Sequence, residues 1–529
     1  MRTRTILLAT ALAGSVAFAP AAFTSETGNQ SEGTGSSNFT LVENLPHSDG
    51  GRGSDIEFAT FTYVDADAAE AAGFKVDPAA DATDEPGIQK DIALAGTTGQ
   101  RLYLYDVTDP NNVYETAAYE CPANQGDTQV FTRDGRTYTT YTVEDGGSAV
   151  SLSSPCAVDA GLTQLDINEG SGVTGTFIID ITDPFNPAAT AFIPVKEGSH
   201  NGTVHPSGNY FYNSNSSLVT EPVLGEGLPG IEVYDISDFD DIKRTTKLML
   251  PPVPLSLGFE SHDITFDDDG DRAYSAALSQ GVVIDTTDPA NPSIISTFVD
   301  PTIQVWHQSD PIDVGDRRFL VIEDEVAGAT GTGQCPNGGV HVYEVTGDLE
   351  LAPVKVGYWN IDELRVMATE GGDTPIAPSC TAHVFRLHPE ANVMTISYYN
   401  GGVRVVDLNG LVGVNLGSLN QVNVTVNGYG QAPMTQIGFR RFEDSNSWAA
   451  KSPRITVDAD GNLQDFTVFS NGGRGLDVLA FDADDSAGAA DAAKSSQWLT
   501  PAEAELKLGT VQLTPGEVYN NLSAYSCLL

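Results

Sequence analysis

Four histidines stand at matching positions in four consecutive segments of the chain. Each precedes the turn of a predicted hairpin by eight residues: His200 before Gly208, His262 before Gly270, His307 before Gly315 and His383 before Ala391. Neutral imidazole is a common ligand for Zn, Cu, Fe and Ni. Four imidazoles that converge on one point would therefore hold one transition metal, and Cu, Fe and Zn are the candidates.

The same repetition has a structural interpretation, in which the histidines join neighbouring segments through hydrogen bonds. The restriction to four adjacent segments favours a site over a repeat feature. The corresponding positions in the other segments are Ser54, Asp127 and Pro453. A ligating imidazole also needs a partner for its second ring nitrogen. The candidate partners are Asp263, Asp310 and Glu323.

The segments that position these histidines are copies of one unit, which is clearest between residues 260 and 298. Four short runs of strand-forming residues alternate there with turns rich in Asp, Gly, Asn and Pro. Seven such copies follow one another, the last at residues 453–482. Their third strands end in acids at Asp106, Asp180, Asp235, Asp285, Glu344, Asp407 and Asp482. Seven four-stranded units predict an all-β fold, a seven-bladed β-propeller.

The third strand and the turn after it carry a family resemblance. The sequences VIDTTDPANP, IIDITDPFNP, VYDISD and VRVVDL resemble the LVIVD repeats of secreted bacterial propellers, over about residues 50–485. This resemblance implies the propeller fold and an exported protein. The His-Asp starts of the blades are also similar to those of selenium-binding-protein-like methanethiol oxidases, which implies copper oxidase chemistry. Carotenoid oxygenases, which hold a metal with four channel histidines, offer a fold-level analogy.

Export is also predicted from the N-terminus. Residues 1–22 read as a signal peptide, with Arg2 and Arg4 before an apolar run and a cleavage position near Ala22. Residues 23–50 are expected to be a flexible leader, 51–485 the propeller, and 486–529 a tail with a short helix after Pro501. No later apolar run approaches the ~20 residues of a membrane helix. We therefore expect a protein that is secreted or held at the cell surface.

The composition constrains the partners. Lys and Arg total 26 against 72 Asp and Glu, which gives a net charge of −46. Such an acidic surface repels nucleic acid, so a small ligand or a surface partner is expected instead. The acidic turns at residues 267–271 and 458–462 lack the closing glutamate of an EF-hand and are interpreted as ordinary hairpin turns.

Five cysteines are compatible with disulfides in an exported protein. We predict the pairs Cys121–Cys156 and Cys335–Cys380, and Cys527 is left without a partner. Long insertions at residues 145–172, 217–229 and 323–338 are expected at the mouth of the propeller that carries the histidines. Loops held around a concave mouth are a common place for function.

Two of the remaining histidines, His205 and His388, precede turn prolines, which indicates a role in the turns. His341 lies between Val340 and Val342 in a predicted strand, and the alternation places it at the surface.

Three functions remain open at this point. The first is a ligand- or partner-binding module that uses the loop-rich mouth and its four-histidine ring. The second is a metal-dependent oxidoreductase, with the histidines as ligands of Cu or Fe. The third is a structural or adhesion module. No G-x-S-x-G, P-loop or H-E-x-x-H motif is present, so no catalytic residue can be named and the question of an enzyme stays open.

Overall fold

The computed structural model describes residues 33–76, 87–144, 150–164, 172–215, 230–253, 260–325, 338–361, 381–413, 434–442 and 444–485. All of them belong to one compact unit, Glu32–Leu529. Their strands form seven antiparallel sheets, which confirms the seven-bladed β-propeller. The predicted signal peptide and tail, at residues 1–22 and 486–529, lie outside the described residues, as do Cys335, Cys380 and Cys527.

Each blade has four main strands, to which the sixth adds a short fifth at its edge, and each copy of the sequence repeat supplies most or all of one blade. In order along the chain the blades are β3 (Gly53–Tyr63), β4 (Ile88–Thr97), β5 (Arg101–Asp106) and β6 (Tyr114–Glu120); β7 (Thr128–Arg133), β8 (Arg136–Val143), β9 (Gly175–Asp180) and β10 (Ala188–Pro194); β11 (Ser199–Val204), β12 (Tyr210–Asn215), β13 (Gly230–Asp235) and β14 (Lys243–Met249); β15 (Asp263–Phe266), β16 (Arg272–Ala276), β17 (Gly281–Asp285) and β18 (Ser293–Phe298); β19 (Trp306–Val314), β20 (Arg317–Asp324), β21 (Val340–Glu344) and β22 (Val354–Trp359); β23 (His383–His388), β24 (Val393–Ser397), β25 (Val403–Asp407) and β26 (Thr435–Arg441); and β27 (Ser447–Lys451), β28 (Phe466–Gly472) and β29 (Gly475–Phe481) with β2 (Phe39–Leu45).

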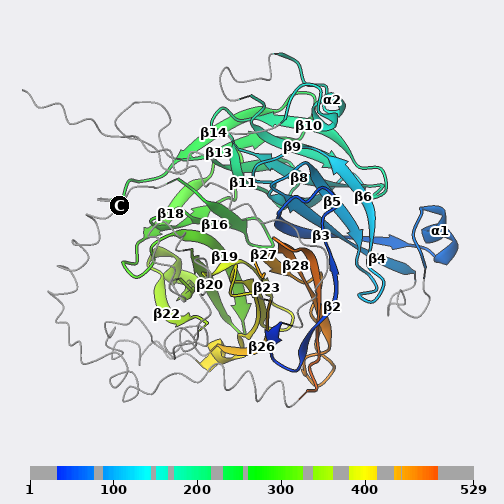
Figure 1. Cartoon of the computed structure of the whole chain (residues 1–529). Helices are drawn as coiled ribbons and strands as arrows, with labels where there is room; N and C mark the ends of the chain where they lie inside the picture. Colours follow the sequence, from blue (N-terminus) through cyan, green and yellow to red (C-terminus); the bar gives the residue numbers. More distant parts are fainter. Residues whose placement is uncertain are drawn as a thin grey trace, which may run out of the picture. The chain divides into compact units, whose positions relative to one another are not determined.

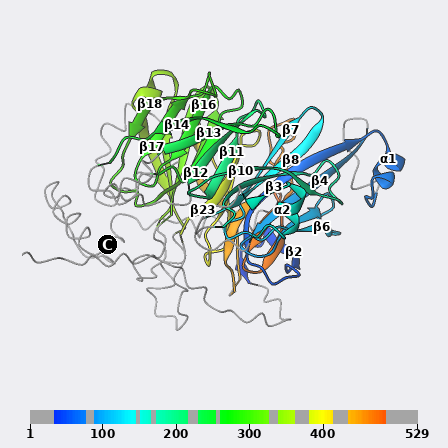
Figure 2. The same cartoon turned by 90° about the horizontal axis from the view of Figure 1, so that it is seen from above.

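The first strand of every blade faces the propeller axis. These inner strands, β3, β7, β11, β15, β19, β23 and β27, contact one another in sequence order, and β27 contacts β3 to complete the circle. Figure 1 shows the blades following one another around this centre, with colour changing along the sequence. In the perpendicular view, strands of successive blades lie side by side from β7 and β8 through β12 and β13 to β16 and β17 (Figure 2).

The apolar faces of the blades are buried against one another. The buried side chains fall into seven clusters, and each cluster joins two neighbouring blades within the described part of the chain. Ile92 of the first blade and Phe177 of the second, for example, belong to one such cluster. A four-stranded sheet alone would expose two apolar faces, and radial stacking removes both from water.

The repeated acid at the end of each third strand has a structural role. Asp106, Asp180, Asp235, Asp285 and Asp407 each accept a hydrogen bond from the backbone N–H two residues later. This side-chain contact forms the turn that sends the chain to the outer strand. The resemblance to known repeats therefore depends largely on turn chemistry.

The N-terminal segment closes the circle of blades. We expected residues 23–50 to be a flexible leader, but β2 pairs with β29 as the outermost strand of the seventh blade. A second short strand, β1 (Thr34–Gly35), pairs with β26 at the edge of the sixth blade. The Ser/Thr/Gly-rich residues that precede β2 concealed it, although β2 itself, FTLVENL, carries the apolar residues of a strand.

Replacing Phe39 with leucine is expected to destabilise the protein. Phe39 is fully buried in β2, and its ring contacts that of Phe481 at a centroid distance of 6.1 Å. The smaller side chain leaves a void between β2 and the rest of the seventh blade. This void lowers the free energy of unfolding by about 1–2 kcal/mol. Thr40→Ala is the matched control on the exposed face of the same strand. A lower midpoint of urea unfolding for Phe39→Leu alone would support the role of β2 in closing the circle of blades. Equal midpoints for both variants would contradict that role.

Short helices accompany the blades: α1 (Ala66–Ala71) lies between β3 and β4, and α2 (Pro155–Asp159) lies in the predicted insertion at residues 145–172. The predicted disulfide Cys121–Cys156 is present and ties α2 to the segment after β6. Two short 3-10 turns, η2 (Gly347–Leu351) and η3 (Asn409–Gly413), complete the elements. Within the described residues, no helix has the length and apolar character needed to cross a membrane.

Candidate functional site

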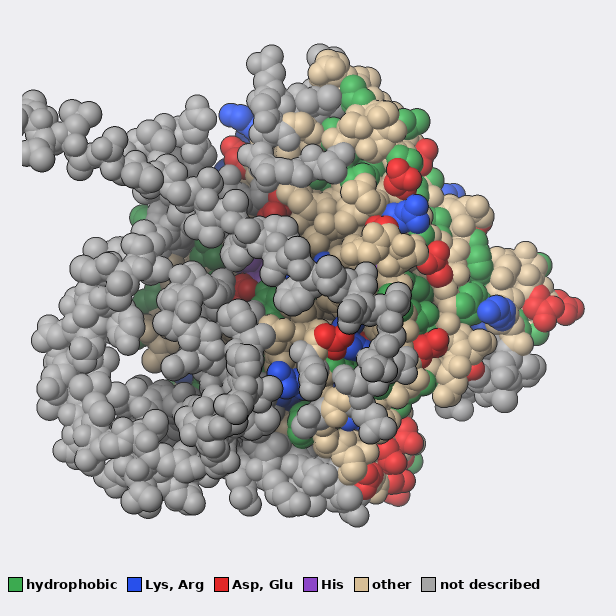
Figure 3. All heavy atoms as spheres, viewed as in Figure 1, with side chains coloured by type: hydrophobic (Ala, Val, Ile, Leu, Met, Phe, Trp, Pro, Cys, Tyr) green, Lys and Arg blue, Asp and Glu red, His purple; other side chains and the backbone are tan. Residues whose placement is uncertain are grey.

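The structure brings the four predicted histidines together in a row across neighbouring inner strands. His200 lies in β11, His262 directly precedes β15, His307 lies in β19, and His383 begins β23. Their ring centroids are separated by 4.3, 4.0 and 4.5 Å in that order. In the space-filling view, histidine and acidic side chains are visible together near the middle of this face (Figure 3).

Irregular backbone at the start of the inner strands directs these side chains. Register shifts occur between Ser199 and Asn201 in β11 and between Trp306 and Ser309 in β19. A third lies after His383, where Val384 has a φ of +26°. β-Bulges re-aim side chains, and a β-branched residue with positive φ is strained, so the fold holds these histidines in place at an energetic cost.

Three of the four rings use Nδ1 for a hydrogen bond to the protein. Nδ1 of His200 lies 2.5 Å from Oε1 of Glu144. The Nδ1 atoms of His262 and His383 donate to the carbonyl oxygens of His307 and Trp448, at 3.1 and 2.6 Å. A carboxylate or carbonyl acceptor fixes the tautomer with the proton on Nδ1, and it leaves the Nε2 lone pair free.

The Nε2 atoms face one another and a carboxylate. The Nε2 atoms of His200 and His262 are 2.9 Å apart. Glu325, directly after β20, brings Oε2 to 3.6 Å from Nε2 of His307 and Oε1 to 4.0 Å from Nε2 of His383. Ligand atoms from His262, His307 and Glu325 all lie within 4.8 Å of one another, so this group could hold a metal ion.

The surroundings keep three of the imidazoles neutral. Burial lowers the pKa of His262 well below its usual value, and the neighbouring histidines lower it further. Burial also lowers the pKa of His307 to about 4, although the negative charge of Glu325 opposes the shift. For His383, burial and then His307 lower the pKa well below its usual value. Neutral imidazole is the form that binds metal.

Glu323 was a predicted partner for a ring nitrogen, and the structure places it beside His307. Its side chain is 0% exposed, and Oε1 lies 3.5 Å from Nδ1 of His307. Among the described residues, neither its oxygens nor that Nδ1 has a hydrogen bond of normal geometry. Burial, followed by the charge of Asp310, raises the pKa of Glu323 well above its usual value. A carboxyl that is neutral in this position can donate a hydrogen bond.

Aromatic side chains close the other side of the group. The hydroxyl of Tyr399 donates a 2.6 Å hydrogen bond to Oε1 of Glu325, and its ring centroid lies 4.4 Å from that of His383. Trp448 packs edge-on against His383 at 4.6 Å, and the guanidinium of Arg52 lies 5.0 Å from the Trp448 ring. Tyr399 has a φ of +43°, which is uncommon outside glycine. This uncommon backbone conformation occurs at the residue whose hydroxyl contacts Glu325.

Tyr399→Phe is expected to weaken metal binding without unfolding the protein. The variant keeps the ring and removes only the hydroxyl that orients Glu325. Loss of such an orienting contact typically weakens metal binding about 10- to 100-fold. Competition with a chelator measures the change, and Tyr119→Phe, which loses a hydroxyl contact to Asp159 in the first blade, is the matched control. Equal metal affinity in both variants would contradict the orienting role.

Below the histidines the propeller axis contains a cavity of about 560 Å³. Two of the predicted histidine partners, Asp263 and Asp310, line this cavity instead of contacting the histidines through their carboxylates. Ser54 and Asp127 also line it, as their register predicts. The prediction of Pro453 as the seventh counterpart is wrong, because the inner strand β27 begins at Ser447.

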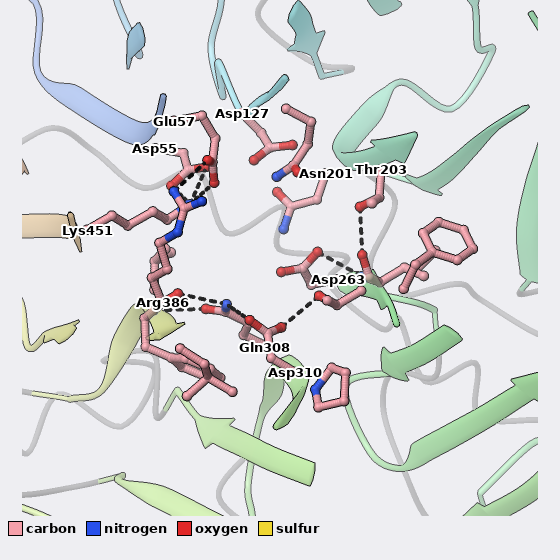
Figure 4. A pocket seen from close by; sticks show the side chains of 18 of the residues that line it. Asp55, Glu57, Asp127, Asn201, Thr203, Asp263, Gln308, Asp310, Arg386 and Lys451 are labelled. Atoms are coloured by element: carbon pink, nitrogen blue, oxygen red, sulfur yellow. Dashed lines mark hydrogen bonds and ion pairs between the residues drawn. The ribbon is translucent and has the colours of Figure 1, made fainter. Parts of the chain in front are cut away.

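One cation is buried at the wall of this cavity. Nζ of Lys451 lies 2.8 Å from Oδ1 of Asp55 and 2.6 Å from Oε1 of Glu57, and Arg386 reaches Glu57 at 3.0 Å (Figure 4). Burial lowers the pKa of Lys451, but Asp55 and Glu57 outweigh that effect and raise it above its usual value. Lysine therefore stays charged and joins the first and last blades.

The remaining histidines have structural contacts. His205 pairs with Ser207 and with the carbonyl oxygen of Gly270, in keeping with the predicted turn role. His388 also ends its inner strand beside a turn acid, Glu390. The prediction of His341 at the surface is wrong, because the side chain is buried and its Nδ1 lies 2.8 Å from Nζ of Lys355.

Comparisons with known proteins add a likeness in fold. No family model matches the chain, and no curated protein matches it. Among solved structures, the β-propeller domain of Cps50 (Swd1) from Myceliophteria thermophila has a TM-score of 0.46 at 9% identity, covering 83% of this chain and 98% of that one. The periplasmic gluconolactonase PpgL of Pseudomonas aeruginosa has a TM-score of 0.43 at 11% identity, covering 73% and 94%. A functionally unknown protein from Desulfotomaculum acetoxidans gives 0.37 at 14% identity, covering 60% and 78%.

Proposed function

We propose that this propeller binds one transition-metal ion through His200, His262, His307, His383 and Glu325, and that the metal serves the binding of a small ligand in the axial cavity. The histidines lie in or directly before four inner strands, and side chains held by strands are positioned more precisely than side chains on loops. Cu, Fe and Zn suit a set of imidazoles with one carboxylate.

The contact between His200 and His262 carries this proposal. Both rings have an acceptor at Nδ1, so two lone pairs face each other across 2.9 Å at the Nε2 atoms. Such a contact is repulsive unless a proton or a metal ion lies between the nitrogens. A proton on His262 is disfavoured, because burial and the nearby rings lower its pKa. With metal–nitrogen distances of about 2.0–2.1 Å, two ligands at right angles are about 2.9 Å apart.

An oxidoreductase is the second candidate, and one observation favours it. His307 and His383 belong both to the histidine group and to the lining of the axial cavity. A small molecule in the cavity would therefore meet a metal held by those residues. Redox-active Cu or Fe would suit such a reaction, whereas Zn would indicate binding or hydrolysis.

Elemental analysis of the protein, purified without a histidine tag, tests the proposal. We expect about one Cu, Fe or Zn per chain that survives gel filtration. Cu or Fe would then justify assays of oxygen consumption with small reductants. A folded protein that holds no metal, even after incubation with each ion in turn, would overturn the metal site and favour the structural interpretation of the histidines.

Export remains part of the proposal. A disulfide such as Cys121–Cys156 persists in oxidising compartments, which supports a protein that functions outside the cytoplasm. An exported chain that begins near residue 23 would support cleavage of the predicted signal peptide. Retention of the intact N-terminus on a protein inside the cell would contradict it.

A further inference from the structure

One arginine near the histidine group has no acidic partner among the residues that the structure describes. Arg52 directly precedes β3, is exposed, and forms no ion pair within that part of the chain. By contrast, Lys451, Arg386 and Arg318 each contact a carboxylate. The protein has 72 acidic residues for 26 Lys and Arg. In such a chain acidic partners are plentiful, so an exposed guanidinium without one is accessible to an anionic ligand.

The backbone that carries Arg52 is held in place. Its carbonyl oxygen accepts a 2.9 Å hydrogen bond from the N–H of Thr98. Just before it, the side chain of Asp49 accepts hydrogen bonds from the N–H of Gly51 at 2.7 Å and from that of Gln100 at 3.2 Å. These contacts join the segment before β3 to the turn between β4 and β5. Arg52 therefore starts from a fixed position at the edge of the first blade.

The guanidinium itself is oriented by an aromatic ring. Its central carbon lies 5.0 Å from the centre of the Trp448 ring, and Nη2 donates a 3.2 Å hydrogen bond to Oδ1 of Asn446. Within the described residues, Asn446 is the only acceptor that this guanidinium contacts. Arginine stacked on an aromatic face keeps its planar set of N–H donors for a carboxylate, which it binds through two parallel hydrogen bonds.

Trp448 connects Arg52 to the proposed site. The same ring packs against His383 at 4.6 Å and lines the axial cavity. Arg52 is also close enough to act on the histidine group through its charge. Burial and then His307 lower the pKa of His383, and the positive charge of Arg52 adds to this effect. A ligand beside the histidines would therefore lie near a cation that the described protein does not neutralise.

We propose that Arg52 binds the carboxylate of the ligand, and that the ligand is a small monocarboxylic acid. The inference rests on the proposed function and deepens it, because it names the ligand class of the same site. A phosphate ester fits less well, since its two negative charges would meet one such cation in a protein with a net charge of −46. The uncharged part of the ligand would extend along Trp448 toward the axial cavity.

Titration calorimetry with benzoate, in a chloride-free buffer of low ionic strength, tests this role, and the metal content of each sample is measured alongside. We expect saturable binding near one molecule per chain, and no such binding of the neutral benzyl alcohol. Arg52→Gln should bind benzoate about 10- to 100-fold more weakly, because a charged hydrogen-bond donor is lost, and should keep the metal content of the wild type. Arg136→Gln removes an exposed arginine at the start of β8, and this control should bind as the wild type does.

Equal affinity of Arg52→Gln and the wild type for benzoate, or equal binding of benzyl alcohol, would overturn the proposal. Saturable binding of inorganic phosphate that benzoate cannot displace would assign Arg52 to an inorganic oxyanion instead. If Arg52→Gln does not fold, as judged by circular dichroism, Arg52→Lys replaces it, since lysine keeps the charge and loses the planar set of donors. Bound metal without benzoate binding would refute this inference and leave the metal site standing. Benzoate binding through Arg52 without bound metal would do the reverse.

Discussion

Replacing His262 and His307 together with alanine is expected to abolish metal retention while the propeller stays folded. Both belong to the group whose ligand atoms, with those of Glu325, lie within 4.8 Å of one another. Changing only the orienting contacts of a metal site typically costs about 10- to 100-fold in affinity, so losing two ligands should exceed that range. Elemental analysis after gel filtration, and chelator competition on reloaded protein, measure the loss.

His205→Ala is the control for this experiment. His205 is also a buried histidine of the third blade, but its ring contacts Ser207 and the carbonyl of Gly270. The His205→Ala variant should keep the full metal content of the wild type. Unchanged metal in the double variant would refute the assignment of ligands. A metal-free wild type whose thermal midpoint falls in the double variant would instead indicate that the histidines hold the blades together.

The fold was predictable because one physical unit repeats. Turn acids such as Asp285 recur with apolar strands before them, and their spacing identifies both the blade and the number of blades. The alternation of polar and apolar residues along a strand was less informative about which side chains are exposed to solvent. Both faces of a blade are buried against neighbours, so a polar residue between two apolar ones, such as His341, need not reach water.

The candidate site was predictable only where it follows the repeat. The histidines share a register that the repeat shows directly. Glu144 and Glu325 directly follow the second strands of their blades and Tyr399 follows another by two residues, but their residue types differ and no repeated residue marks this position. Trp448 was not predicted because its strand, β27, precedes residues 453–482, the predicted seventh copy of the repeat. Contacts made by such residues depend on how blades from distant parts of the sequence meet, and spacing within one blade carries no information about that.

Lys451→Met is expected to destabilise the protein by about 3–5 kcal/mol at pH 8, because it removes the cation from a buried cluster. Lys451 is 5% exposed and lies between Asp55 and Glu57. Without it, two carboxylates face each other with only Arg386 nearby. Urea unfolding of the wild type and the variant at pH 8 and pH 5 measures the difference.

The loss in Lys451→Met should be smaller at pH 5. Burial already raises the pKa of Asp55 in the wild type, and removal of Lys451 raises the carboxyl pKa values further. A carboxyl with a folded pKa above its unfolded value gains stability as the pH falls toward the unfolded value, because the folded state then binds the proton more tightly. Lys243→Met, in an exposed pair with Asp241, should leave unfolding unchanged at both pH values. A variant as stable as the wild type at pH 8 would mean that Asp55 and Glu57 share a proton there, and the lysine would then not be needed to join the first and last blades.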